Sequence, residues 1–211
     1  MIVQKYTFNP FQTNTFIIHS GSEAVLIDAS AHMPEEFDLI ESYISENKLT
    51  VKALLLTHGH IDHIMGCAHL TETYGMPWML NPADKPFVDR AQDQARMFGV
   101  EFDPRQIKTT PIKEGDSVRF GDVDWSVLET PGHSPGSVSF VDEENEVVIS
   151  GDVLFNGSIG RTDLLFGSMP VLMQSIYQKL IPLGDQFKVL CGHGPDTIIG
   201  HERAMNPFLQ G

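Results

Sequence analysis

The sequence has few cysteines and no long run of apolar residues. Its 2 cysteines, Cys67 and Cys191, lie far apart and outside any CxxC spacing, so the pattern of a zinc knuckle or a redox cysteine pair is absent. No stretch approaches the roughly 18 uninterrupted apolar residues that a membrane helix needs. Residues 1–6 lack the basic-then-apolar pattern of a signal peptide. We therefore expect a cytoplasmic protein.

Basic residues are also scarce. Lysine and arginine total 14 against 28 aspartates and glutamates, which gives a formal net charge of −14. A chain with this charge repels phosphate backbones and anionic lipid surfaces. We therefore expect a small-molecule substrate, with neither nucleic acid nor a membrane as a partner. No pattern in the sequence indicates a protein partner.

The rest of the composition is that of a globular protein. Hydrophobic residues make up 41% of the 211 residues, and there are 18 glycines, which argues against disordered, collagen-like and disulfide-scaffold classes. A chain of this length commonly folds as one unit and buries roughly 70% of its unfolded surface. We expect a single domain over residues 1–211.

Strand and helix patterns alternate along the chain. Apolar runs and alternation predict strands at residues 15–19, 24–28, 51–57, 117–120, 123–129, 137–141, 147–150 and 187–190. Helical spacing predicts helices at residues 35–47, 62–74, 84–97 and 169–180. The run at 51–57 is too apolar for a solvent-facing strand and suits a sheet covered on both faces. This order favours two sheets between helix layers, although an ordinary doubly wound sheet fits the same periodicity.

The densest cluster of ionisable residues follows that apolar strand. Residues 57–63 read THGHIDH. In an extended segment, residues two apart point the same way, so His58 and His60 can bind one ion. Asp62 and His63, at the start of the following helix, are displaced toward a second ion. One motif can therefore supply ligands to two metal ions.

Further candidate ligands stand at the ends of other predicted strands. His133, Asp152 and His193 each follow a glycine after an apolar strand, and His60 also follows a glycine. A residue without a side chain permits the tight turn and close backbone approach that such a site requires. Strand ends are also where open α/β folds place their chemistry. Asp28, at another strand end, either orients a metal ligand or caps a turn.

Together these side chains suit two divalent ions. We expect three histidines on one ion, two histidines and an aspartate on the other, and a further aspartate able to bridge them: His58, His60 and His133; Asp62, His63 and His193; and Asp152. Nitrogen and oxygen donors suit Zn²⁺, Fe or Mn²⁺, of which we expect zinc. Buried imidazoles and carboxylates clustered without a cation are costly, which disfavours a set of unrelated core histidines. Structural zinc sites are usually closed and often rich in cysteine, which disfavours a purely structural ion.

Residues 58–63, followed in order by His133, Asp152 and His193, resemble the HxHxDH signature and later ligands of the metallo-β-lactamase superfamily. Within it, residues 130–137, 150–152 and 192–195 resemble the type II glyoxalases, the hydroxyacylglutathione hydrolases, and residues 201–209 resemble their short bacterial subgroup. The resemblance implies an α/β fold, an αββα sandwich with two mixed sheets between helix layers. It also implies that Asp152 bridges the ions. Zinc β-lactamases with a cysteine ligand carry cysteine there, so we do not expect penicillin cleavage.

The resemblance implies a binuclear metallohydrolase that cleaves a thioester such as S-lactoylglutathione. A metal-bound hydroxide attacks the carbonyl carbon, and a metal ion stabilises the oxyanion. We expect Asp62 and Asp152 to take part in catalysis. Arg161 is the one Lys or Arg between residues 121 and 178, in a glycine-rich loop. It is a candidate to hold a substrate carboxylate, and its alternative is a surface ion pair with Asp163.

Three other functions compete with this one. Persulfide dioxygenases share the fold, hold one iron at the equivalents of His58, His133 and Asp152, and have a loop that residues 160–163 resemble. Residues 192–195 favour the hydrolase. Phosphodiesterases and nucleases on this scaffold usually carry basic surfaces, which this acidic chain lacks, and a non-catalytic metal-binding module is disfavoured by the complete ligand set. The longer glyoxalases carry a C-terminal helical extension with basic glutathione contacts, whereas this sequence ends at Gly211, so the thiol carrier and acyl group stay open.

Overall fold

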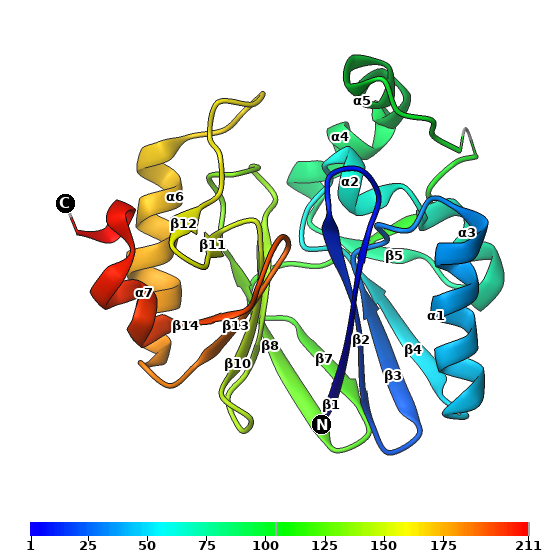
Figure 1. Ribbon diagram of the computed structural model, residues 1–211, viewed down its shortest axis with the longest axis horizontal. Coiled ribbons are helices and arrows are strands. Elements are labelled where there is room, and N and C mark those ends of the chain that lie inside the picture. Colours follow the sequence, from blue (N-terminus) through cyan, green and yellow to red (C-terminus); the bar gives the residue numbers. More distant parts are fainter. Residues whose placement is uncertain (104, 211) are drawn as a thin grey trace.

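The structure, a computed structural model, describes residues 1–103 and 105–210 and contains two mixed sheets (Figure 1). The first sheet has, in spatial order, β1 (Ile2–Phe8), β2 (Thr13–Ser20), β3 (Glu23–Ile27), β4 (Thr50–Leu55), β5 (Trp78–Leu80) and β6 (Thr109–Pro111). The second has β14 (Thr197–Ile198), β13 (Lys188–Cys191), β10 (Val147–Gly151), β9 (Val138–Asp142), β8 (Val123–Glu129) and β7 (Ser117–Phe120). A separate hairpin pairs β11 (Leu154–Phe155) with β12 (Ser158–Ile159). The predicted domain extends to Gly211, which lies outside the described residues.

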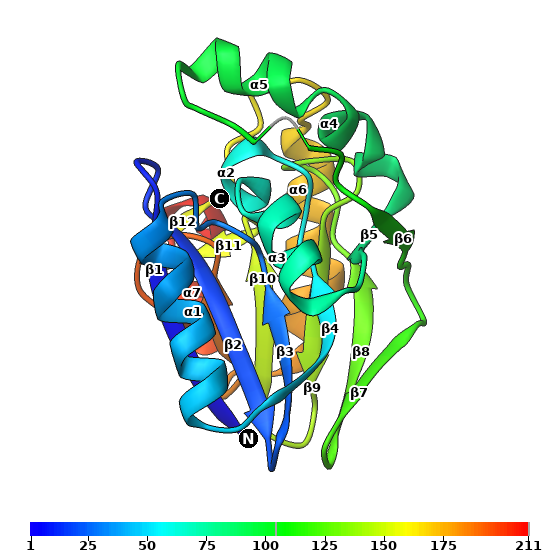
Figure 2. The same ribbon diagram turned by 90° about the vertical axis from the view of Figure 1, so that its right-hand side faces the viewer.

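Helices cover the outer face of each sheet and one end of the sandwich. The helices are α1 (Pro34–Glu46), α2 (Ile61–Ile64), α3 (Cys67–Tyr74), α4 (Lys85–Asp89), α5 (Ala91–Phe98), α6 (Met169–Ser175) and α7 (Ile199–Met205). Of these, α2, α4 and α5 lie at that end of the sandwich (Figure 1 and Figure 2). Figure 2 turns α1 and α3 toward the viewer, in front of the first sheet, while α6 and α7 lie beyond the second sheet in Figure 1. The order of layers confirms the expected αββα sandwich.

The apolar core is divided into layers by the alternation of side chains along the strands. Ile17 of β2 packs with Ile40 of α1 in the layer beneath the helices. Its neighbours Phe16 and Ile18 pack on the other face, between the two sheets, with Trp125 of β8. Because successive residues of a strand point to opposite faces, one strand serves both layers. Each such fully buried side chain stabilises the fold by about 1.5–3 kcal/mol.

Two central strands bring the functional loops to one end of the sandwich. β4 runs parallel to β3 and β5, and β10 runs parallel to β13. The segment after β13 is tied back to the first sheet, since Asn14 N donates to Gly192 O at 2.7 Å and Thr13 pairs with His193. The loops that follow β4, β10 and β13 therefore meet.

The helix predicted at residues 62–74 is interrupted, and this prediction was wrong in that respect. The chain between α2 and α3 bonds to the segment after β3: Gly66 N donates to Ala29 O, and Ala29 N donates to His63 O, both at 2.8 Å. A Cβ atom on Gly66 would lie 2.6 Å from Ala31 O. These contacts to another part of the chain replace the hydrogen bonds that a continuous helix would make.

Other boundaries differ in smaller ways. The helix predicted at 84–97 is a 3-10 turn, Pro82–Asp84, followed by α4 and α5, which meet at Arg90. The helix predicted at 169–180 ends in a π-helical turn, Ile176–Leu180. The predicted strands agree with the structure within two residues, whereas β1, the short strands β5, β6, β11, β12 and β14, and α7 were not predicted. Among the described residues, no helix is both long and apolar enough to cross a membrane.

Candidate metal centre

Three histidine rings converge where the loop after β4 meets the loop after β8. His133 Nε2 lies 2.8 Å from His60 Nδ1 and 3.2 Å from His58 Nε2. All three rings are buried. Burial and the neighbouring His133 lower the pKa of His60 to about 3, and burial also holds the pKa of His58 well below its usual range. Both imidazoles are therefore neutral at physiological pH, which is the form that binds a metal ion.

A second set forms beside the first. His193 Nε2 lies 3.2 Å from Asp62 Oδ2, and His63 Nε2 lies 3.4 Å from the same oxygen. Thr13 Oγ1 donates a hydrogen bond to that oxygen at 2.8 Å, and His193 Nδ1 lies 3.1 Å from Phe11 O. The loop between β1 and β2 and the first residue of β2 therefore position two side chains, Asp62 and His193, that come from distant parts of the sequence.

Asp152 lies between the two sets. Its Oδ1 is 3.4 Å from His63 Nε2, and its Oδ2 is 3.5 Å from His133 Nε2 and 3.3 Å from His193 Nε2. The structure thus brings together all seven predicted ligands, in groups whose donor atoms lie within 4.8 Å of one another: His58, His60 and His133; His58, His63 and Asp152; and Asp62, His63 and His193.

The donor atoms fit divalent cations. His63 Nε2 and Asp152 Oδ1 are buried and have no hydrogen-bond partner among the described residues. Buried polar atoms without a partner are rare because the lost solvation is costly. Oxygen and nitrogen donors from carboxylates and imidazoles are the set that zinc, iron and manganese accept. A cation placed among these atoms would satisfy them.

The charges of the second set support the same conclusion. Burial alone would raise the pKa of Asp62, but His63 and His193 lower it to about 2. Burial alone would lower the pKa of His193, but contacts with Asp152 and Asp62 raise it to about 10. Asp62 and Asp152 are therefore negatively charged at neutral pH, and protons on His63 and His193 balance them, a positive charge that a bound cation would replace.

Asp28 orients one of the candidate ligands. Its Oδ2 accepts hydrogen bonds from His63 Nδ1 and Thr57 Oγ1, each at 2.8 Å, and its Oδ1 accepts one from Thr57 N at 2.8 Å. Asp28 has a left-handed backbone with φ of 58°, a strained conformation that the surrounding contacts hold. Because His63 Nδ1 carries the donated proton, its Nε2 is free to face the cluster. Of the two readings of Asp28, the structure favours the positioning role.

Comparison with known proteins identifies the family of this fold and cluster. Residues 8–193 match the family model of the metallo-β-lactamase superfamily. The chain belongs to this superfamily. The hydroxyacylglutathione hydrolase GloC of Haemophilus influenzae is 37% identical over 202 residues, which cover 94% of this chain and 93% of that protein.

Solved structures of the superfamily superpose along nearly the whole chain. A structure of TTHA1623 in a di-iron-bound form has a TM-score of 0.88 at 38% identity, covering 98% of this chain and 100% of that one. BLEG-1, described as a B3 metallo-β-lactamase, has a TM-score of 0.87 at 36% identity, with 100% of both chains covered. ETHE1 from Myxococcus xanthus has a TM-score of 0.77 at 27% identity, covering 98% of this chain and 84% of that one. The di-iron-bound structure and the present His and Asp cluster together support a dinuclear metal site.

Asp84 holds two of the ligand loops together, and the sequence did not reveal it. Its Oδ2 accepts hydrogen bonds from Gly59 N at 2.8 Å and Ser134 Oγ at 2.7 Å, and its Oδ1 accepts one from Gly136 N at 2.6 Å. These partners lie 25 to 52 residues away along the chain. An aspartate next to a helix start looks like an ordinary cap in sequence, so no local signal distinguishes it.

At two positions, the glycine that precedes a candidate ligand is required because other atoms leave no room for a Cβ atom. A Cβ atom on Gly192 would lie 2.1 Å from Asp152 Oδ1, one of the donor atoms. Gly132 has a left-handed φ of 131°, and a Cβ atom there would lie 2.2 Å from Leu172 N. Glycine therefore allows the loops of this superfamily member to approach closely enough for their ligands to converge.

Arg161 lies on the wall of the cleft above the cluster. Its Nε and Nη2 atoms donate to the carboxylate of Asp163 at 2.8 and 2.7 Å, and the guanidinium side chain is 56% exposed. The backbone oxygen of Arg161 accepts a hydrogen bond from His133 Nδ1 at 2.8 Å. The residue thus forms the predicted alternative, an ion pair with Asp163, and its backbone also orients a candidate metal ligand.

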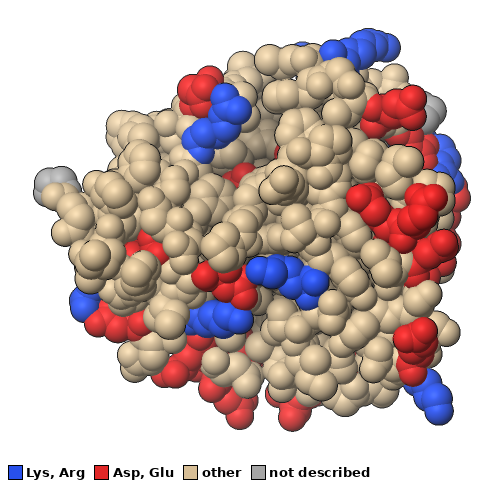
Figure 3. Space-filling view, in the orientation of Figure 1, with Lys and Arg blue, Asp and Glu red and all other residues tan. Residues whose placement is uncertain are grey.

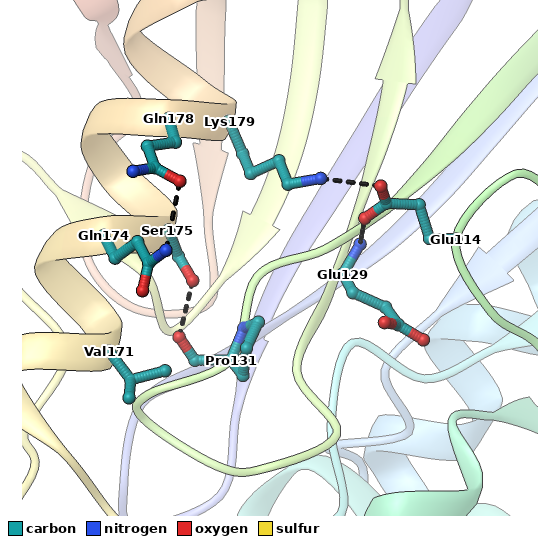
Figure 4. A pocket seen from close by; sticks show the side chains of 8 residues that line it. All are labelled: Glu114, Glu129, Pro131, Val171, Gln174, Ser175, Gln178 and Lys179. Carbon is teal, nitrogen blue, oxygen red and sulfur yellow. Dashed lines mark hydrogen bonds and ion pairs between the residues drawn. The ribbon is translucent and has the colours of Figure 1, made fainter.

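The cluster forms the floor of an open cleft of about 670 Å³. Figure 3 shows the hollow, which is surrounded mainly by uncharged side chains. A different hollow of about 600 Å³ contains none of the clustered ligands, and Figure 4 shows its lining. There Lys179 pairs with Glu114 at 2.6 Å, and Ser175 Oγ donates to Pro131 O at 2.7 Å. Its polar groups are engaged with one another, so the cleft over the cluster is the candidate active site.

Proposed function

We propose that this protein is a metal-dependent hydrolase that cleaves a thioester such as S-lactoylglutathione, with two divalent ions, most simply Zn²⁺, as its cofactor. The observation that carries the proposal is the convergence of seven candidate ligands, in sets linked by Asp152, at the floor of an open cleft. The similarity to the hydroxyacylglutathione hydrolase GloC supports the choice of substrate. The proposed partner is therefore a small molecule.

The residues of the chain have separate roles in this proposal. When bound, divalent ions supply a nucleophile that is ionised near neutral pH and positive charge where the carbonyl oxygen becomes an oxyanion. Asp62, anchored by Thr13, and Asp152 hold negative charge at the floor of the cleft. His58 and His60 remain neutral through burial. Because a thiolate is a weakly basic leaving group, the site requires no strong general acid.

Arg161 is the proposed contact for a substrate carboxylate, which would replace the carboxylate of Asp163 on the guanidinium group. Its exposed guanidinium lies on the same cleft as the metal ligands. Planar guanidinium groups bind carboxylates through two parallel hydrogen bonds, as Arg161 already does with Asp163. An anionic substrate can therefore take over a geometry that is already formed.

The test is the rate of thioester loss from S-lactoylglutathione, measured with metal-loaded protein and with protein stripped by a chelator. We expect rapid hydrolysis that the chelator abolishes and added Zn²⁺ restores. His133→Ala should lower kcat/KM by at least about 100-fold, because a direct ligand matters at least as much as its supporting groups. The exposed His201 on α7 provides the matched control, His201→Ala, which should retain full activity.

The same assay tests Arg161. Arg161→Gln should raise KM by about tenfold with kcat nearly unchanged, the pattern of a lost ground-state contact. An unchanged KM would show that Arg161 does not contact the substrate. Its roles would then be the ion pair with Asp163 and the backbone contact with His133. A fully metallated sample that does not hydrolyse S-lactoylglutathione would reject this substrate. Because BLEG-1 is described as a β-lactamase, a chromogenic β-lactam belongs among the substrates measured.

The second candidate is an iron-dependent persulfide dioxygenase on the same fold. The similarity to ETHE1 favours it, as does the sequence of residues 160–163, and the di-iron-bound structure shows that a similar protein accepts iron. One bound iron per chain with oxygen uptake in the presence of glutathione persulfide would support this activity. Two bound metal ions and no oxygen uptake would support the hydrolase.

A further inference from the structure

The walls of the cleft above the metal centre are strongly apolar. They are contributed by separate segments: Phe11 comes from the loop between β1 and β2, Phe87, Met97 and Phe98 come from α4 and α5, and Leu165 and Phe166 come from the loop before α6. We call these residues the apolar wall. The candidate metal ligands lie below it, at the floor of the cleft.

The apolar wall contains aromatic contacts that begin at the metal centre. The ring of Phe87 packs edge-on against that of His60, with centroids 4.8 Å apart. Phe87 also contacts Phe166 at 6.0 Å, and Phe11 contacts Phe98 at 5.6 Å. The aromatic contacts therefore link segments that are distant in sequence, and one of them reaches a candidate ligand directly.

The outer part of the apolar wall is left in water. Met97 is 77% exposed, Phe166 is 62% exposed and Leu165 is 60% exposed, although the core of the protein buries comparable side chains almost completely. Exposed apolar side chains that line one cleft mark a binding surface, because covering them is favourable. A ligand that reaches from the metal centre to these residues would bury them.

The cleft walls carry few charged side chains that could bind an ionic group of a ligand. Arg161 is engaged by Asp163, and Arg90 and Asp93 add one charge of each sign. Apart from Arg161, the proposed contact for a substrate carboxylate, the walls offer an ionic group one charge of each sign, and the rest of their lining is mostly apolar. A lactoyl group is small and polar, so by itself it cannot cover the exposed apolar side chains of the wall.

We propose that the apolar wall selects thioesters that carry an apolar group of about four to eight carbons next to the reacting bond, a size that a cleft of this volume accommodates. This inference rests on the proposed thioesterase function and specifies its substrate class. Each buried methylene is expected to raise kcat/KM by about three- to fourfold. A hexanoyl thioester should therefore exceed the lactoyl thioester by at least about tenfold.

The first test is a binding measurement that requires no turnover. Calorimetry on the Zn²⁺-loaded protein compares S-hexylglutathione with S-methylglutathione, two thioethers that cannot be hydrolysed. The hexyl ligand should bind at least about tenfold more tightly, because its chain covers the apolar wall. Equal dissociation constants would overturn the inference.

Variants locate the preference in the apolar wall. Met97→Ser combined with Phe166→Ser should reduce the ratio of the two dissociation constants to about threefold or less, since these exposed side chains supply the covering surface. Met205→Ser is the matched control, because Met205 on α7 is 66% exposed and does not line the cleft. An unchanged ratio of the two dissociation constants in the double variant would show that the preference does not lie in the apolar wall.

Kinetics then shows on which side of the thioester the apolar group lies. S-hexanoylglutathione carries it on the acyl side, and the lactoyl thioester of hexanethiol carries it on the sulfur side. A preference over S-lactoylglutathione in either arm supports the inference and identifies the side. Hydrolysis of S-lactoylglutathione without a preference in either arm overturns the inference alone. Tighter binding of the hexyl ligand without hydrolysis of any thioester rejects the proposed function instead.

Discussion

At the scale of single residues, the candidate centre depends on groups outside the metal-binding set. Asp28 fixes the proton of His63 on Nδ1, and Thr13 holds Asp62. Such partners restrict the rotation of a ligand before the ion arrives, which lowers the cost of binding. Their contribution should therefore appear in metal affinity.

Asp28→Asn should lower the affinity for Zn²⁺ by about 10- to 100-fold. The amide nitrogen of asparagine cannot accept the His63 Nδ1 proton, whereas the remaining oxygen can still accept Thr57 N. Competition with a chromogenic chelator measures the affinity. Asp124→Asn, which removes an exposed carboxylate paired with Arg119, should leave the affinity unchanged. An affinity in Asp28→Asn equal to that of the original protein would contradict the positioning role.

At the scale of elements, contacts from other segments decide where helices begin and end. Helix α1 starts after Met33, and Glu36 in its first turn accepts hydrogen bonds from His32 N at 2.8 Å, Met33 N at 3.2 Å and Asn9 N at 3.1 Å. Amide groups in the first turn of a helix lack partners within it, and a carboxylate there satisfies nearby donors. Glu36 thereby connects α1 to the loop between β1 and β2 that positions the site.

Glu36→Gln should reduce the free energy of unfolding by about 1 kcal/mol at pH 7. Burial opposes the charge, but the three backbone donors lower the pKa of Glu36 below its usual range. A carboxyl with a lowered pKa in the folded state stabilises the protein above its unfolded pKa, about 4.3, and loses this contribution as the pH falls through the folded value.

Urea unfolding at a series of pH values measures this effect. The difference between Glu36→Gln and the original protein should be constant near neutrality and should disappear on acidification below about pH 4. Glu35→Gln, at the exposed neighbouring position, is the matched control and should show little difference at either pH. A difference that persists at low pH would show that the carboxylate charge is not its source.

At the scale of the whole molecule, the metal centre joins the two sheets. His58, His60, Asp62 and His63 follow β4 of the first sheet, whereas His133, Asp152 and His193 follow strands of the second. An ion bound by ligands from both sheets cross-links the two halves of the sandwich. It therefore binds the folded state far better than the unfolded chain. Ligands of this kind stabilise a protein by mass action.

Removal of the metal should therefore lower the melting temperature. With free Zn²⁺ at about 1,000 times the dissociation constant, the stabilisation is about 4 kcal/mol, which corresponds to about 8–16 °C for a protein of this size. Differential scanning calorimetry with and without a chelator measures the shift. His133→Ala should show a smaller shift in melting temperature, because the group of His58, His60 and His133 has lost one ligand. Identical melting temperatures in both conditions would contradict a metal site shared between the sheets.

The sequence by itself determined the order of most strands and of the longer helices, the α/β class and the members of the His and Asp cluster. These features are local or periodic. Alternation along β2 divides its residues between two layers of the core. The motif at residues 57–63 places four candidate ligands within one short segment. The candidate ligands could be chosen because each stands at the end of an apolar strand, where a chain reversal is already encoded.

Only the tertiary structure decided how these parts are held in place. The break between α2 and α3 at Gly66 follows from hydrogen bonds to the segment after β3, and the roles of Asp28 and Asp84 follow from partners 25 or more residues away. The apolar wall is assembled from segments that share no pattern in the sequence. Such contacts depend on how distant segments pack, and local propensity and periodicity carry no information about that packing.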